Sequence, residues 1–207
     1  MQDVPLIFSL AILVISVVIH EVSHGSVANL LGDPTARLEG RLTLNPLKHV
    51  DFVGSFIVPL VTFFTTAGHF VFGWAKPVPY NPYNLRGGKW GPAIVAAAGP
   101  LSNLFVAIFF GFGVRALDLA GVYLPIQAGP IIGAIIGTNI LLAVFNLVPI
   151  PPLDGSKVLF ALLPYNARVV QEFLEKNQYF ILFIFVFFLS NYLSPIIDFI
   201  FRLIVGA

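Results

Sequence analysis

The chain has 207 residues, of which 57% are hydrophobic and 10% are charged, and its mean hydropathy is +0.91. Soluble domains carry about 25% charged residues, so this composition excludes an ordinary soluble protein and indicates a membrane protein. The formal net charge of +1 gives no reason to expect nucleic acid as a partner. Cysteine is absent, which excludes disulfides and thiolate metal sites, so a bound metal would have to use His, Asp or Glu.

Four segments are long and apolar enough to cross a bilayer, which takes about 20 helical residues. Transmembrane helices are predicted at residues 5–31, 92–114, 128–150 and about 179–203. The first segment has no basic residues before it and no obvious cleavage site, so we expect it to stay as a helix and not to be removed as a signal peptide. Ser194 and Pro195 interrupt the last segment, which allows one span followed by a short interfacial helix.

A fifth apolar run, residues 52–72, either crosses the bilayer or re-enters it from one side. Lysine and arginine are enriched in cytoplasmic loops, so their distribution bears on this choice. If the run re-enters, six basic residues between the first two helices and three between the last two share one side, nine of the 11 in the chain. The re-entrant arrangement therefore predicts an N-terminus outside the cell. The lack of a cleavable presequence favours a prokaryotic plasma membrane.

Two polar stretches, residues 32–51 and 74–89, mix alternating apolar and polar residues with proline and glycine, and both are predicted to form short β-hairpins. Irregular backbone persists at membrane depth only where it packs on protein or lines a wet cavity, so we expect these loops beside an internal site. The sequence has no internal repeat. The prediction is an all-α polytopic membrane protein in which residues 1–207 form a single domain.

The first predicted helix carries ionisable residues among apolar neighbours, where such groups are costly and need a reason. His20, Glu21 and His24 form the pattern His-Glu-x-x-His. Residues four apart share one face of a helix, so both imidazoles can reach one ion while Glu21 stands beside it as a base for bound water. Two histidines and a carboxylate suit zinc, which keeps a fourth position for water. The alternative is a chance match to this pattern. That alternative is weaker here than on a soluble helix, because lipid offers no solvent to the three polar side chains.

A third ligand has to come from another segment, and Asp154 is the best candidate. It follows three prolines at the end of the third predicted helix, where the helix must break and can turn a carboxylate inward. The alternative is an ordinary turn or capping role for the Asp-Gly pair. If residues 52–72 re-enter, the first and third helices both run from outside to inside, and Asp154 reaches the depth of His20 and His24.

These motifs closely resemble the site-2 protease family of intramembrane zinc metalloproteases. The resemblance rests on HEVSHG at residues 20–25, AAAGPLSN at 96–103 and NLVPIPPLDG at 146–155, and it extends to both polar loops. It implies that His20, His24 and Asp154 bind Zn²⁺, that Glu21 activates the water, and that Asn146 helps to hold the substrate strand or the developing oxyanion. For Asn146 a hydrogen bond between helices is the alternative. Because the chain has no insertion that could be a PDZ domain, it resembles the minimal form of the family.

The predicted function is hydrolysis of peptide bonds within or next to transmembrane segments of membrane-protein substrates, with an active site open to the cytoplasmic side of the lipid bilayer. The competing hypotheses are an intramembrane metal transporter without protease activity and a catalytically silent scaffold. The absence of repeated halves with paired broken helices argues against a transporter, and the intact base argues against a scaffold. The sequence indicates neither the particular substrate nor the oligomeric state.

Overall fold

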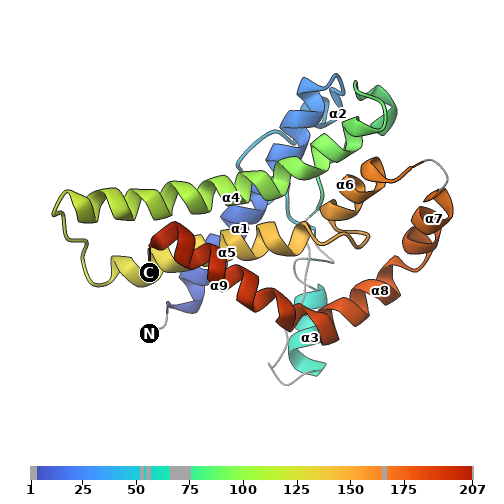
Figure 1. Ribbon diagram of the computed structural model, residues 1–207. Helices are drawn as coiled ribbons and strands as arrows, with labels where there is room; N and C mark the ends of the chain where they lie inside the picture. Colours follow the sequence, from blue (N-terminus) through green and yellow to red (C-terminus); the bar gives the residue numbers. More distant parts are fainter. Residues whose placement is uncertain (1–3, 52–53, 55–56, 66–75, 165–166, 207) are drawn as a thin grey trace.

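A computed structural model describes residues 4–51, 54, 57–65, 76–164 and 167–206, and the regular structure within them is helical, without strands. The α-helices are α1 Leu6–Leu30, α2 Thr35–Leu38, α3 Val58–Thr65, α4 Trp90–Leu119, α5 Ala128–Asn146, α6 Asp154–Leu162, α7 Arg168–Lys176, α8 Gln178–Ile184 and α9 Ser194–Val205. Short 3₁₀ helices lie at Pro46–Lys48, Pro82–Asn84 and Ser190–Leu193, and a π-helix lies at Phe185–Leu189. Figure 1 shows the arrangement.

In the described part of the chain, three helices, α1, α4 and α5, are long and apolar enough to cross a membrane, with 25, 30 and 19 residues. At about 1.5 Å per residue, even the shortest approaches the roughly 30 Å of a bilayer's hydrocarbon core. The first three predicted spans are thus confirmed as apolar helices. The helix α4 is longer at both ends than the predicted 92–114. Pro92 lies in its first turn, where a missing N–H removes no helical hydrogen bond.

The fourth predicted span is not one straight helix. Residues 178–189 and 191–205 form two helical parts with an angle of 62° between them, and they pass as a span only if the bent pair is counted together. The helix α9 begins at Ser194 with Pro195 in its first turn. The predicted interruption is therefore present, but four clear spans are not confirmed.

The two predicted β-hairpins are not confirmed either. In residues 32–51 the chain forms α2 and a 3₁₀ turn, and the described part of 74–89 begins with residues that have no regular secondary structure, followed by another 3₁₀ turn. The Asp33 carboxylate accepts hydrogen bonds from the N–H and hydroxyl of Thr35, which favours a helical turn over a strand. Pro77 and Pro79 lack the N–H groups that a paired strand needs.

Most of the fifth apolar run, 52–72, lies outside the described residues. Within it the structure describes α3, which has eight residues. Whether the run crosses the bilayer or re-enters therefore stays a prediction.

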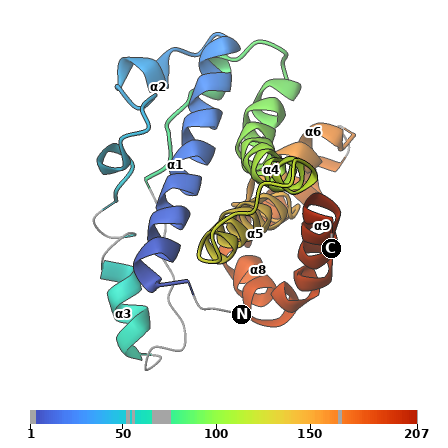
Figure 2. The ribbon, with the colours of Figure 1, turned by 90° about the vertical axis from the view of Figure 1, so that its left-hand side faces the viewer.

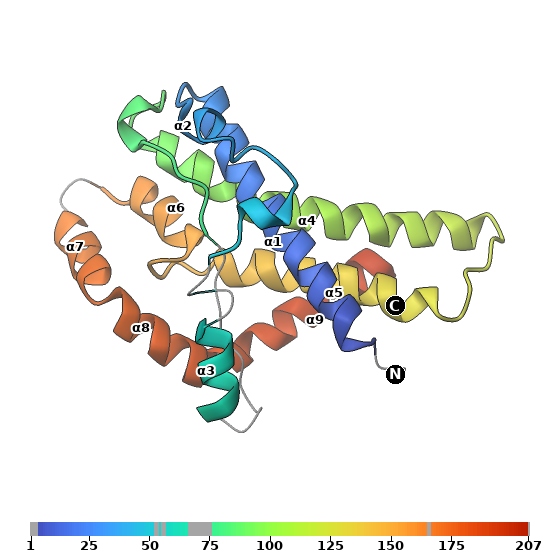
Figure 3. The same cartoon turned by 180° about the vertical axis from the view of Figure 1, so that it is seen from behind.

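The helix α4 lies at the centre of the bundle and packs against α1, α5, α6 and α9 (Figure 2). Small and branched side chains fill one core between α4, α5 and α9, formed by Ala107, Ile136, Ile140 and Ile204. Large apolar side chains such as Leu6, Phe105 and Phe109 are exposed, as expected of surfaces that face lipid. The start of α1, the end of α4 and the start of α5 lie toward the same end of the molecule (Figures 1 and 3). The three candidate spans therefore alternate in direction.

Candidate metal centre

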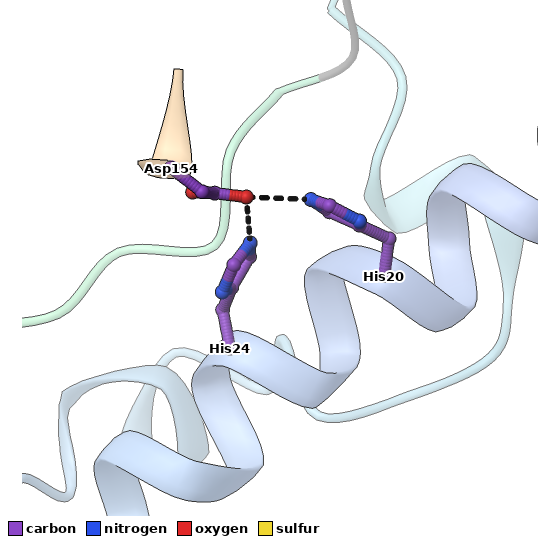
Figure 4. Close-up of side chains that lie close together, drawn as sticks. All are labelled: His20, His24 and Asp154. Atoms are coloured by element: carbon purple, nitrogen blue, oxygen red, sulfur yellow. Dashed lines mark ion pairs between the residues drawn. The ribbon is translucent and has the colours of Figure 1, made fainter. Parts of the chain in front are cut away.

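Three predicted site residues meet in the structure. His20 and His24 project from one face of α1, and Asp154 is the first residue of α6 (Figure 4). The Asp154 Oδ2 lies 3.1 Å from His20 Nε2 and 3.2 Å from His24 Nε2. One ligand atom from each residue lies within 4.8 Å of the other two, a group that could hold a metal ion. This is the arrangement expected from the His-Glu-x-x-His spacing and the proline-rich break.

The chain between α5 and α6 turns sharply, and this turn brings Asp154 to α1. The helix α5 ends at Asn146, and three prolines in residues 147–153 prevent it from continuing. Gly155 follows Asp154, and a side chain there would collide with the backbone oxygens of Leu147 and Val148. A glycine is therefore required for the first turn of α6 to pack this closely against the end of α5.

Each histidine is held through its other ring nitrogen. His24 Nδ1 lies 2.7 Å from the carbonyl oxygen of Val95 on α4. A carbonyl only accepts, so His24 carries a proton on Nδ1, and the neutral ring then directs its Nε2 lone pair toward Asp154. His20 Nδ1 lies 2.6 Å from the side-chain oxygen of Asn103, also on α4. His20 therefore donates from Nδ1 to the Asn103 oxygen, as His24 donates to the Val95 carbonyl, and the two neutral rings have the same tautomer.

The convergent atoms fit a metal ion. With both histidines neutral and protonated on Nδ1, two nitrogen lone pairs and a carboxylate oxygen face one another. Asp154 Oδ2 is buried with no hydrogen-bond partner in the described part of the chain. Acceptors at this distance repel one another unless a cation lies among them. Gly99 on α4 borders the same space, because a Cβ there would collide with the Nε2 atoms of His20 and His24. The donor set of two imidazoles and one carboxylate is one that catalytic zinc sites use.

Glu21 is adjacent to this group and faces a loop. Its Oε2 accepts a hydrogen bond of 2.8 Å from the backbone N–H of Val78. The loop is anchored by Lys76, whose N–H donates to His49, and by Arg41, whose guanidinium donates to the carbonyls of Lys76 and Pro77. The Glu21 carboxylate is therefore held in one orientation by irregular backbone.

The structure places Asn146 at the end of α5, where its side chain donates to the carbonyl of Leu142 one turn back. This bond lies within one helix, so it is not the helix-to-helix bond considered as the alternative. It does not connect Asn146 to the group of His20, His24 and Asp154.

Sequence reasoning missed several residues around the centre. It assigned no role to Asn103, Asn139 or Ser16, which form a buried network behind His20. It included Gly99 only as part of the motif at residues 96–103. A signal was present, because Asn103 and Asn139 are amides within long apolar segments, where polar side chains usually have a partner. The contact of Val78 with Glu21 had no such signal, since any residue except proline offers an N–H.

Comparisons with known proteins identify the family of this chain. Residues 121–189 match the model of Peptidase family M50. The chain is 35% identical over 189 residues to the Bacillus subtilis (strain 168) protein named "Putative zinc metalloprotease YwhC", an alignment that covers 89% of this chain and 79% of that protein. A shorter match, 39% identical over 69 residues, is to "Putative zinc metalloprotease Rip3" of Mycobacterium tuberculosis, and it covers 33% of this chain and 17% of that one. No solved structure matches.

Apolar helices of spanning length and a histidine and carboxylate centre define the class as a membrane-embedded zinc metalloprotease. The chain belongs to peptidase family M50, the site-2 proteases, and it is a zinc metallopeptidase that acts on membrane proteins. This membership does not favour the metal-transporter alternative.

Proposed function

We propose that His20, His24 and Asp154 hold the catalytic zinc and that Glu21 is the general base. The observation that carries this proposal is the buried Oδ2 of Asp154, which faces the Nε2 atoms of both histidines and has no hydrogen-bond partner among the described residues. Bound zinc supplies a Lewis acid for the scissile carbonyl and lowers the pKa of its water.

Glu21 takes the proton of the attacking water and passes it to the leaving amine. Its place directly after His20 on α1 puts it beside the metal ligands, and the N–H of Val78 fixes one of its oxygens. A carboxylate that is already oriented loses little freedom when the reaction begins, which supports its use as a base.

Asn146 is proposed to hold the substrate strand or the developing oxyanion. The support is its position at the end of α5, just before the turn that leads to Asp154. One N–H of the Asn146 side-chain amide donates to the carbonyl of Leu142. The second N–H of the same amide can then donate to a ligand. Replacement of Asn146 by Ala tests this, because loss of an oxyanion donor lowers kcat by about 10²–10³-fold without altering zinc affinity.

The substrate is proposed to be a transmembrane segment that unwinds locally before cleavage, since helical peptide bonds are protected by internal hydrogen bonds. The active site is proposed to open to the cytoplasmic side of a prokaryotic plasma membrane, with the N-terminus outside. Supporting this orientation, α1, α4 and α5 alternate in direction and the loops with most basic residues follow α1 and α5.

The test is cleavage of single-span model substrates by purified protein in liposomes, together with zinc content. We expect one zinc per chain, loss of cleavage in Glu21→Gln with zinc retained, and loss of both in Asp154→Asn. A wild-type protein that cleaves without zinc, or an Asp154→Asn protein that keeps zinc at wild-type affinity, would contradict the assignment. Phe109→Leu is a matched control, because Phe109 is 65% exposed on α4.

A further inference from the structure

A chain of polar side chains crosses the apolar core behind His20. It links Ser16 and His20 of α1 to Asn103 of α4 and Asn139 of α5. Asn103 and Asn139 have no exposed surface, and Ser16 is 3% exposed. Buried amides in apolar helices are expensive unless every donor and acceptor is paired, so the pairing determines how each amide points.

The orientation of Asn139 follows from a backbone carbonyl. Its side-chain nitrogen lies 2.9 Å from the carbonyl oxygen of Ile135 and 2.9 Å from Ser16 Oγ. A carbonyl oxygen accepts only, so the atom facing it must be the nitrogen. Both N–H groups of Asn139 are then used, and its Oδ1 faces Asn103.

The orientation of Asn103 follows in the same way. Its nitrogen donates to Asn139 Oδ1 at 2.9 Å and to the backbone carbonyl of Ser16 at 3.2 Å. Both of its N–H groups are therefore used, and its oxygen has to face His20. That oxygen can only accept, so His20 must donate from Nδ1, and the neutral ring then has its lone pair on Nε2.

We infer that Asn103 and Asn139 are positioning residues that hold His20 in its metal-binding tautomer, with Asn139 acting through Asn103. The inference rests on the proposed role of His20 as a ligand. Partners of this kind fix the ring of a ligating histidine, and their loss typically lowers metal affinity by about 10–100-fold. His24 needs no such side chain, because a backbone carbonyl does the same work.

The experiment measures zinc affinity by competition with a chelating dye in detergent. Asn103→Leu removes the acceptor for His20 and is expected to weaken zinc binding about 10–100-fold. Asn103→Asp keeps an acceptor facing Nδ1 but loses the two N–H groups that face Asn139 and Ser16, so it is expected to weaken zinc binding less than Asn103→Leu. Asn139→Leu frees Asn103 to rotate, and its zinc affinity is expected to lie between those of the two Asn103 variants.

Ile140→Ala is the matched control for packing. Ile140 is fully buried next to Asn139 on α5 but does not take part in the network. It should lower stability and leave zinc affinity unchanged. Equal weakening by Asn103→Leu and Ile140→Ala, or an Asn103→Leu affinity within threefold of wild type, would overturn the inference.

A second readout is made on the wild-type protein itself. In metal-free wild-type protein labelled with ¹⁵N-histidine, long-range ¹H–¹⁵N spectra at mildly alkaline pH distinguish a protonated Nδ1 from a protonated Nε2. The chain has four histidines, so His20 can be assigned by replacement. We expect a proton on Nδ1 of His20, and a proton on Nε2 would overturn the inference.

The two failures are distinguishable. If wild type binds no zinc, the proposed function fails whatever the tautomer. If wild type binds zinc and Asp154→Asn does not, while Asn103→Leu binds as well as wild type, only the positioning role fails.

Discussion

Two clusters of buried polar side chains in this molecule satisfy their hydrogen-bonding groups in different ways. The first, behind His20, lies within the apolar helices and consists of neutral amides and a hydroxyl. The second lies at the end of α1 outside the spans and is built on Asp33, a carboxylate with no exposed surface. Asp33 accepts from the Thr35 hydroxyl, from Asn84 and from the backbone N–H of Asn81.

This fold buries the charge of Asp33 in a loop outside the candidate spans. Burial alone raises the pKa of Asp33, but hydrogen bonds from Thr35, Asn84 and Asn81 outweigh it and hold the pKa below its ordinary value. A loop can bring that many donors to one carboxylate because its backbone is irregular. Helices within a bilayer have their N–H groups already paired, so their buried clusters use neutral groups.

The two clusters also differ in how directly they contact the candidate metal centre. The amide cluster touches His20 directly. The Asp33 cluster joins the end of α1 to residues 81–84, in the same loop whose Val78 holds Glu21. We therefore expect changes in the first cluster to alter zinc binding and changes in the second to alter stability first.

The largest expected effect comes from Gly99→Ala. Its methyl group would occupy the space bordered by the Nε2 atoms of both histidines. Zinc binding and cleavage should be lost, measured by metal content and by substrate cleavage. Gly113→Ala on the same helix meets no atom within 4 Å and is the matched control. Full zinc content in Gly99→Ala would show that the metal does not lie in the space between Gly99 and the two histidines.

Next is Asp33→Asn, which replaces an acceptor oxygen with a donor that faces other donors. We expect a loss of about 1–3 kcal/mol in the free energy of unfolding with unchanged zinc affinity. Denaturant unfolding in micelles measures the first and dye competition the second. Asp118→Asn, at an exposed position of α4, should change neither. A weaker zinc affinity in Asp33→Asn would remove the distinction between the clusters.

A smaller effect is expected from Val95→Ala. The ring of His24 bonds the backbone oxygen of Val95, so its side chain should be dispensable for the metal. Losing about two buried methyl groups should lower stability by roughly 1.5 kcal/mol and leave zinc affinity within twofold of wild type. Ile94→Ala, at a half-exposed neighbour, controls for the helix. A tenfold loss of zinc affinity would mean that packing at position 95, and not the carbonyl alone, orients His24.

The smallest effect is the pH dependence of the second cluster. The pKa of Asp33 is lower in the folded chain than in the unfolded one. The contribution of its carboxylate to the free energy of unfolding is therefore complete above the ordinary carboxyl pKa of about 3.9, and it is lost as pH falls through the lowered pKa. The stability difference between wild type and Asp33→Asn should therefore be constant from about pH 5 to 7 and shrink below about pH 4. A difference that grows on acidification would contradict the direction of the shift.

Much of the site could be predicted because the information is local. The spacing of His20 and His24 puts both on one face of any helix, and prolines before Asp154 end a helix in any context. Apolar length predicted α1, α4 and α5 for the same reason. The β-hairpins were not predictable from alternation, because a side-chain bond at Asp33 and the prolines at 77 and 79 outweigh it.

The sequence by itself thus indicated the membrane class and predicted that His20, His24 and Asp154 would converge, with Glu21 beside them as the proposed base. Only the tertiary structure decided which groups surround them, namely Asn103 behind His20, the Val95 carbonyl behind His24, the absent side chain of Gly99 between them and the Val78 N–H on Glu21. The physical reason is that these contacts join elements far apart in the chain. They depend on how α1, α4 and α5 cross, which periodicity within one helix does not specify.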